Sequence, residues 1–134
     1  MPGTAAQLPG VLALRRSLMG DDIYWDDEAY LQWRYRFGAS DRGGGDCWVL
    51  LLANTVRGMV GTEEVLLQIG ERRIPSWSTM DIAIDPALEG SGLGSWMNLR
   101  ICEIAGCALT IGSNEKSRNM ISRCFRRVGE DRVE

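Results

Sequence analysis

Residues 89–95, with the sequence EGSGLGS, are the part of this chain whose residue types most directly suggest chemistry. They follow an apolar stretch that ends at Pro86 and precede a stretch with helical periodicity. A loop between a strand and a helix directs backbone N–H groups to one point, because the first turn of a helix has four unpaired donors and a partial positive charge. Glycine has no Cβ, so Gly90, Gly92 and Gly94 would let a bulky anion approach the backbone. The segment predicts a site for a phosphate or diphosphate group that needs no lysine.

Two common phosphate-binding loops do not match this segment. A Walker loop requires a Gly-Lys-Ser/Thr sequence, which does not follow here. A dinucleotide-binding loop spaces its glycines as G-x-G-x-x-G, whereas Gly94 falls one position early. An ordinary glycine-rich turn between a strand and a helix is the alternative interpretation.

The chain contains no histidine, so a general base would have to be a carboxylate, a cysteine or water. Asp81 is the first candidate, because it lies just before the apolar residues that lead into the glycine loop. Strand alternation would place Asp81 and Ala83 on the same face of a sheet. A partly buried carboxylate there would have a raised pKa and could act through water, whereas a solvated carboxylate at a strand edge is the alternative. Glu63, on the preceding strand, is a weaker candidate, with an exposed strand face as the alternative.

The composition indicates one folded globular domain, since the 134 residues are 45% hydrophobic and 25% charged. No apolar run approaches ~20 residues, and the first residues do not resemble a signal peptide, so we expect a cytoplasmic protein without a membrane-spanning helix. A net charge of -3 argues against nucleic-acid binding. The four cysteines are scattered without a Cys-x-x-Cys pair, so we expect free thiols and no metal site.

Residues 1–44 form a region that we expect to be mainly helical. Residues 11–18 suit either a short helix or a first strand. Residues 26–28 place three carboxylates where a helix favours them, at its beginning. The helix that follows would bury a single apolar face. That face consists of Tyr30, Trp33 and Phe37.

Three consecutive strands are expected after residue 45. Residues 47–53 are continuously apolar, which is typical of a strand covered on both faces. Residues 59–69, with a bend at Gly61, and residues 77–84 follow after short turns. Strands joined in this way form an antiparallel meander.

A helix, a short strand and a last helix complete the expected order. The first of these helices would end at Gly106 and bury one face. That face consists of Leu93, Met97, Ile101 and Ile104. The strand at residues 108–111 is reached through a helix, so it should lie parallel to the preceding strand. The last helix would begin near Asn114 or Ser117.

The glycine loop and its surroundings resemble the coenzyme A loop of the GCN5-related N-acetyltransferases. In that family a strand and a proline precede the pattern Arg/Gln-x-x-Gly-x-Gly/Ala, which opens a helix. Pro86 and residues 89–94 follow this pattern, except that Glu89 stands where the family has arginine or glutamine. Residues 114–117 also resemble the family's Asn-x-x-Ala/Ser at the start of the last helix. The resemblance covers about residues 45–129, which would form the acyl-CoA-binding core of one acetyltransferase-like domain.

The resemblance implies an α+β fold of three layers, in which helices flank a mixed, mostly antiparallel sheet. It departs from the family in two respects: the usual C-terminal hairpin is absent, and no tyrosine stands in the last helix to act as general acid. Ser122 and Cys124 are candidate replacements for that acid, although Cys124 also suits the core. We expect a second copy of the chain to cover the open sheet edge at residues 108–111, which gives a homodimer.

The function implied by the resemblance is transfer of an acetyl or other acyl group from coenzyme A to an amine by direct attack. The acceptor would be a small molecule or a peptide. The alternative is a non-catalytic acyl-CoA-binding module, or a truncated acetyltransferase that acts as a dimeric interaction protein. The expected cofactor-binding residues come from the third strand, the loop and the last helix. They are Ile82, Ala83, Ile84, Glu89, Gly90, Ser91, Gly92, Leu93, Gly94, Ser95, Asn114 and Ser117.

Overall fold

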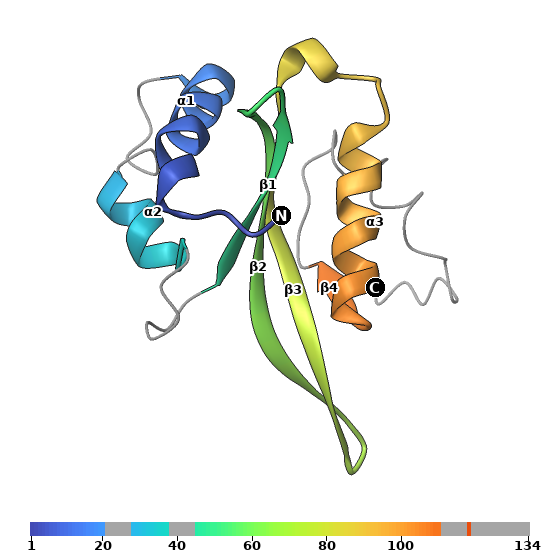
Figure 1. Ribbon diagram of the computed structural model, residues 1–134. Coiled ribbons are helices and arrows are strands. Elements are labelled where there is room, and N and C mark those ends of the chain that lie inside the picture. Colours follow the sequence, from blue (N-terminus) through green and yellow to red (C-terminus); the bar gives the residue numbers. More distant parts are fainter. Residues whose placement is uncertain (21–27, 38–44, 111–117, 119–134) are drawn as a thin grey trace.

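The computed structural model describes residues 1–20, 28–37, 45–110 and 118 of the chain (Figure 1). Most of these residues belong to helices or strands. In chain order the elements are the 3-10 helix η1 (Ala5–Gln7), α1 (Leu8–Met19), α2 (Glu28–Arg34), β1 (Asp46–Leu52), β2 (Thr55–Ile69), β3 (Arg72–Ile84), the 3-10 helix η3 (Pro86–Leu88), α3 (Leu93–Ala105) and β4 (Ala108–Thr110).

The four strands form one mixed sheet in the order β1-β2-β3-β4. The pairs β1/β2 and β2/β3 are antiparallel, whereas β3 and β4 are parallel. The chain passes from β3 to β4 through α3, and such a crossover returns the chain in the same direction. The expected meander followed by a parallel strand is confirmed, as is the expected α+β fold.

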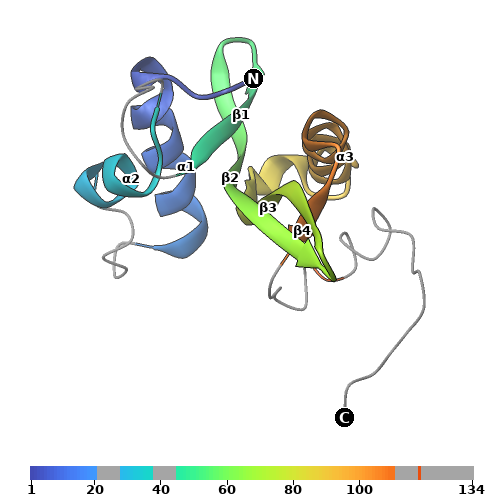
Figure 2. The same ribbon diagram turned by 90° about the horizontal axis from the view of Figure 1, so that it is seen from below.

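Helices cover both faces of the sheet (Figures 1 and 2). Helices α1 and α2 lie on one face and α3 lies on the other, which gives the three layers that were expected. The neighbouring residues Val49 and Leu50 of β1 belong to two separate core clusters, one on each face. Strand β1 is therefore covered on both sides, as its continuous apolar sequence predicted.

Residues 11–18, for which helix and strand were both open, lie in α1. Pro9 lies in the first turn of this helix, where its missing N–H is not needed. Gly20 ends the helix with a left-handed φ of 72°, and its N–H donates to the carbonyl of Arg16 at 3.0 Å. Val11 is fully buried against the sheet.

The apolar face expected for α2 was partly wrong. Trp33 is 71% exposed, whereas Leu31 and Tyr35 are 0% and 1% exposed. The helix ends at Arg34, so Phe37 is buried as part of the segment that follows and not as part of a helical face. Leu31 and Tyr35 are four positions apart and lie one above the other, which turns Trp33 toward solvent.

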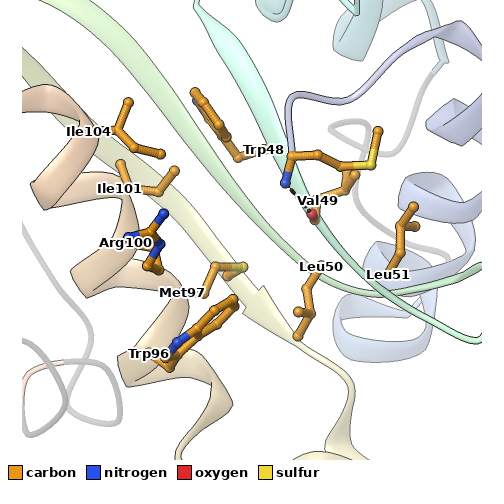
Figure 3. Close-up of a pocket in the computed structure, with 10 residues that line it drawn as sticks. Trp48, Val49, Leu50, Leu51, Trp96, Met97, Arg100, Ile101 and Ile104 are labelled. Atoms are coloured by element: carbon orange, nitrogen blue, oxygen red, sulfur yellow. Dashed lines mark hydrogen bonds between the residues drawn. The ribbon is translucent and has the colours of Figure 1, made fainter.

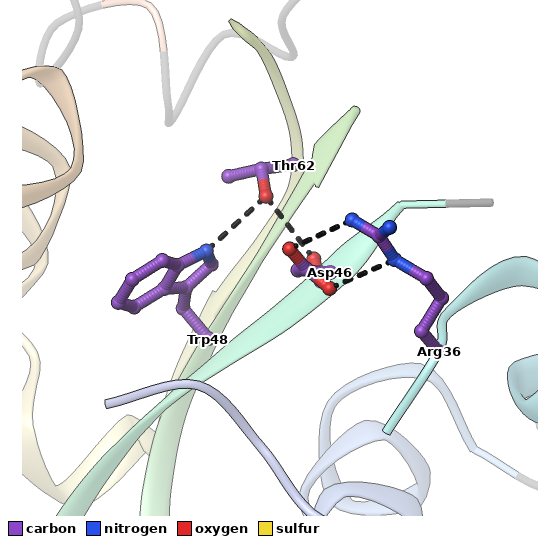
Figure 4. Close-up of polar contacts among 4 residues, drawn as sticks. All are labelled: Arg36, Asp46, Trp48 and Thr62. Carbon is purple, nitrogen blue, oxygen red and sulfur yellow. Dashed lines mark hydrogen bonds and ion pairs between the residues drawn. The ribbon is translucent and has the colours of Figure 1, made fainter. Parts of the chain in front are cut away.

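Polar contacts fix the start of β1 to the segment that follows α2 (Figure 4). The guanidinium of Arg36 donates from Nε and Nη2 to the two carboxylate oxygens of Asp46, at 3.1 and 3.0 Å. Thr62 of β2 accepts a hydrogen bond from the indole of Trp48 at 3.2 Å. These contacts hold β1 in register beside β2 and close to α2.

Helix α3 ends at Gly106 as predicted, with φ 71° and a hydrogen bond from its N–H to the carbonyl of Cys102. Met97 and Ile101 are buried on its sheet-facing side, but Ile104 is 48% exposed, which corrects the expected face. Asn98 is fully buried instead. Within the part of the chain that the structure describes, neither polar atom of its amide has a hydrogen-bond partner.

No helix among the described residues combines the length and the apolar character needed to cross a membrane. The predictions for the last helix and for the missing C-terminal hairpin concern residues 111–134, which lie outside the described residues apart from Arg118.

Candidate functional site

The glycine loop joins the end of β3 to the start of α3 at one end of the sheet (Figure 1). Asp85 fixes the beginning of this connection in two ways. Its Oδ1 accepts a hydrogen bond from the N–H of Ala87 at 2.8 Å, which caps η3. Its Oδ2 lies 2.9 Å from Nε of Arg57 on β2. The turn at Pro86 is therefore held against the sheet, and the loop begins from a fixed point.

The backbone at positions 90 and 92 adopts a conformation that favours glycine. Their φ angles are 79° and 82°, in the left-handed region that other residues rarely adopt. A Cβ at either position would meet nothing within 4 Å, so the space beside both glycines is open. Gly92 is also the N-cap of α3, and its carbonyl accepts from the N–H of Trp96 at 2.9 Å. The loop is exposed, and no side chain of the described residues fills the space beside Gly90 or Gly92.

Several backbone donors of the loop are unused. Among the described residues, the N–H groups of Gly90, Gly92 and Gly94 donate to no acceptor. The N–H of Ser91, by contrast, donates to the carbonyl of Leu88 at 3.1 Å, and the N–H of Leu93 donates to the hydroxyl of Ser91 at 3.3 Å. Three donors thus lie at the positive end of α3, which is an arrangement suited to an anion.

Strand β3 continues past the end of β4. The two strands pair only where residues 77–79 face residues 108–110, so β3 has no described neighbour on that edge beyond Thr79. The N–H of Asp85 donates toward β2, to the carbonyl of Arg57 at 2.8 Å. Backbone groups alternate along an antiparallel strand, so those of Ile84 turn to the opposite, open edge. The expected cofactor residues 82–84 therefore adjoin the glycine loop along one edge.

A β-bulge interrupts β3 at Asp81. Met59 pairs with Ala83 and Gly61 pairs with Met80, so both Asp81 and Ile82 lie opposite Val60. Asp81 has a φ of 51°, a left-handed conformation within a strand. Such a conformation costs on the order of 1–3 kcal/mol for a residue other than glycine and is concentrated at functional sites. Gly61, where a bend was expected, pairs with Met80 next to this bulge.

The carboxylate of Asp81 accepts a hydrogen bond from the hydroxyl of Tyr35. Tyr35 is buried, and burial followed by the negative charge of Asp81 raises the pKa of its hydroxyl far above the ordinary value of 10.0. The hydroxyl therefore stays protonated and remains a donor. Asp81 itself is exposed, which agrees with the alternative of a solvated carboxylate and not with partial burial. Sequence reasoning did not identify Tyr35 as the partner of Asp81, because the two residues are 46 positions apart.

The weaker candidate, Glu63, also approaches the end of α2. Its Oε2 lies 3.7 Å from Nη2 of Arg34, and the same guanidinium donates to the sulfur of Met80. Met80 and Asp81 are adjacent, yet both contact residues at the end of α2, because the bulge breaks the strand's alternation. Glu63, Met80 and Asp81 thus gather on the face of the sheet covered by α2.

A separate cavity of about 500 Å³ lies between β1 and α3 (Figure 3). Trp48 and Leu50 from β1, and Trp96, Met97 and Ile101 from α3, line most of it. No residue of β3 or of residues 84–95 lines this cavity. The described residues that line it are mainly apolar and include no carboxylate, so the cavity is distinct from the glycine loop and from Asp81.

Three predicted site residues, Asn114, Ser117 and Ser122, lie outside the described residues. Within the described ranges, no three residues among histidine, cysteine, aspartate and glutamate gather in a way that could hold a metal ion.

No family model and no curated protein matches this sequence. Solved structures do match. An acetyltransferase of Trypanosoma brucei is 20% identical, with a TM-score of 0.68 over 100% of this chain and 95% of that chain. An aminoglycoside acetyltransferase from an uncultured soil metagenomic sample, in complex with sisomicin, is 14% identical, with a TM-score of 0.71 over 100% and 91%. A predicted acetyltransferase of Clostridium acetobutylicum, with acetyl-CoA, is 12% identical, with a TM-score of 0.71 over 100% and 92%. The chain therefore has the fold of the GCN5-related N-acetyltransferases.

Proposed function

We propose that the chain binds acetyl-CoA, or another acyl-CoA, and transfers the acyl group to an amine. The observation that carries this proposal is the unused N–H groups of Gly90, Gly92 and Gly94 beside the open edge of β3. A diphosphate suits the three donors at the positive end of α3. An extended chain with amide groups suits the backbone of Ile84, because it would add to the sheet as another strand. Coenzyme A carries both features in one molecule.

The other expected ligand contacts follow from this placement. Residues 89–95 would surround the diphosphate, and residues 82–84 would run beside the pantetheine arm. Glu89 is exposed at the start of the loop, where its carboxylate would have to point away from the phosphates. Asn114 and Ser117 remain expected contacts from the last helix.

The reaction would be direct transfer. The amine nitrogen attacks the thioester carbonyl, the N–C bond forms, the C–S bond breaks, and coenzyme A leaves with its sulfur. The incoming ammonium must first lose a proton, for which we assign Asp81, directly or through water. The thioester is already activated, so positioning is the larger contribution of the protein.

The acceptor that we propose is a small-molecule or peptide amine. Two matched structures, one with sisomicin and one with acetyl-CoA, support a small amine acceptor and an acetyl donor. The homodimer expected from the open sheet edge stays a prediction. Small-angle scattering of the purified chain tests it, and a monodisperse monomer would contradict it.

Thermal unfolding with acetyl-CoA, compared with free acetate, tests the proposed binding. A ligand present at about 100 times its dissociation constant should stabilise the protein by about 2.7 kcal/mol. Acetyl-CoA should raise the unfolding temperature and acetate should not. The same shift without acetylation of spermidine, sisomicin or a peptide amine would identify a non-catalytic acyl-CoA-binding module. No shift with any CoA thioester would refute the proposal.

A matched pair of variants locates the ligand. Gly92→Asn keeps a residue that tolerates the left-handed backbone but adds a side chain where the diphosphate is expected. Gly70→Asn makes the same change at another open, left-handed glycine, in the turn between β2 and β3. We expect Gly92→Asn to abolish the acetyl-CoA shift and Gly70→Asn to retain it. Equal shifts in both variants would place the ligand elsewhere.

A further inference from the structure

Asp81 has a left-handed backbone, and its side chain is held by a contact with a buried residue. The carboxylate lies on an exposed part of the sheet, but one of its oxygens is tied to a buried hydroxyl. We propose that Tyr35 is a positioning residue, which orients the Asp81 carboxylate for proton removal from the amine. This inference rests on the function proposed above and adds to it a residue from a different layer of the fold.

The backbone around Tyr35 is fixed by three hydrogen bonds. Its N–H donates to the carbonyl of Leu31 at 2.8 Å, which continues α2 by one hydrogen bond. Tyr35 also forms a parallel bridge with Gly45, next to the start of β1. On either side of it, the N–H of Arg36 donates to the carbonyl of Gly45 at 2.9 Å, and the N–H of Gly45 donates to the carbonyl of Arg34 at 3.2 Å. The side chain thus starts from a rigid position.

The ring of Tyr35 reaches Asp81 across the backbone of Gly61. A Cβ at position 61 would lie 2.2 Å from the tyrosine hydroxyl oxygen, which no side chain permits. Glycine at this position therefore lets the hydroxyl end of the ring pass close to β2 and reach Asp81 on β3. The edge of the ring also packs against Phe37, with centroids 6.3 Å apart and planes at 86°. The hydroxyl cannot easily move away from the bulge.

The two carboxylate oxygens of Asp81 differ in their contacts, because only one of them accepts a hydrogen bond from Tyr35. Oδ2 accepts from Tyr35, and among the described residues Oδ1 accepts from none. Because Tyr35 stays protonated, its hydroxyl can donate but does not compete for the proton of the substrate. The proton of the ammonium then passes to the second oxygen, directly or through water, and from there to solvent. Tyr35 itself neither gains nor loses a proton.

Four variants of the full chain test this role: Tyr35→Phe, Asp81→Asn, the double variant, and Trp33→Phe as the control. Trp33 is 71% exposed on α2, and its ring contacts that of Tyr30. The measurements are acetylation of the amine that the wild-type protein uses, with kcat and KM determined separately, and thermal unfolding. We expect Asp81→Asn to lower kcat by about 100-fold, which is the usual lower range for loss of a general base. Tyr35→Phe should lower kcat by about tenfold, as for loss of one hydrogen bond to a charged group.

The sharpest expectation concerns the double variant. If Tyr35 acts through Asp81, then Tyr35→Phe adds nothing once Asp81 is asparagine, and the two effects on kcat are not additive. The KM for acetyl-CoA should stay within about twofold in all variants, because neither residue adjoins the glycine loop. Trp33→Phe should retain the wild-type kcat.

Three results would overturn the inference, and they differ in what they imply. The double variant could lose kcat by the product of the two single losses, or Tyr35→Phe could leave kcat unchanged. Either result would show that Tyr35 does not act through Asp81 although the enzyme is active. A wild-type protein that acetylates no amine would refute the proposed function, and the positioning role would fall with it.

Discussion

The backbone of Gly61 and the ring of Tyr35 are in such close contact that only glycine fits at position 61. Two further ring atoms of Tyr35 lie 2.7 Å from the place of an added Cβ, so a shift of the hydroxyl alone would not relieve the overlap. Gly61 is buried in β2, where it pairs with Met80 next to the bulge that contains Asp81. The glycine at position 61 thus determines whether the side chain of Tyr35, which follows α2, can extend across β2 to Asp81 on β3.

The first prediction concerns Gly61→Ala. The added methyl should displace the Tyr35 ring and lower the free energy of unfolding by about 1–3 kcal/mol, as overpacking does elsewhere. Chemical denaturation measures this change. Gly20→Ala serves as a control, because its Cβ would meet nothing and its cost comes from the left-handed backbone alone. Unchanged stability in Gly61→Ala would contradict the close contact.

A second prediction separates the two partners of the Tyr35–Asp81 hydrogen bond. Asp81→Gly suits the left-handed backbone but leaves the buried Tyr35 hydroxyl without its acceptor, which costs about 1–3 kcal/mol. Adding Tyr35→Phe removes the unpaired hydroxyl as well. The double variant should therefore be more stable than Asp81→Gly by a similar amount, as measured by urea denaturation. Equal stabilities would mean that the hydroxyl finds another partner.

The buried amide of Asn98 gives a third prediction. Neither of its polar atoms has a partner among the described residues, and the side chain is fully buried on α3. Asn98→Leu keeps a similar volume and removes the unpaired groups, so it should be neutral or stabilise the protein by about 1–3 kcal/mol. Thermal and urea unfolding both measure this. A clear loss of stability would show that the amide has a partner in solution.

A fourth prediction concerns pH. Burial, with smaller effects from the charges of Asp81 and Asp46, raises the pKa of the Cys47 thiol from 9.0 to about 12. The unfolded chain therefore loses this proton at a lower pH than the folded protein. The resulting stability is fully present below pH 9.0 and is lost as the pH rises toward about 12. Cys47→Ala should make the fall of unfolding free energy above pH 9 less steep.

Cys107→Ala is the control for the pH experiment, because Cys107 is only partly buried. Its alkaline profile should match that of the wild-type protein. If Cys47→Ala and Cys107→Ala gave the same profile as the wild type, Cys47 would not be the group responsible.

Local features of the fold were predictable from sequence. The apolar run at residues 47–53 predicted a strand covered on both faces, and Gly106 predicted the end of α3, because both signals depend on a few neighbouring residues. Gly92 was likewise found at the start of a helix. The glycines were first explained by close approach of a ligand, whereas Gly90 and Gly92 also adopt a left-handed backbone.

The surroundings of Asp81 could not be predicted in the same way. Its bulge depends on the register between β2 and β3, and its partner Tyr35 comes from another layer of the fold. Strand alternation alone would have turned Met80 and Asp81 to opposite faces, yet both contact the end of α2. The burial predicted for Trp33 was wrong for a related reason. The core buries Leu31 of α2 and Tyr35, which follows that helix, and Trp33 is exposed.

Among the described residues, the short pairing between β3 and β4 leaves a notch in the sheet beside Ile84. A molecule lying in that notch would become a structural part of the sheet while it is bound. The amide hydrogen of Ile84 would then exchange with solvent more slowly in the presence of acetyl-CoA than in its absence. Slower exchange of the Ile84 amide hydrogen would thus report that acetyl-CoA is bound, whether or not an acyl group is transferred.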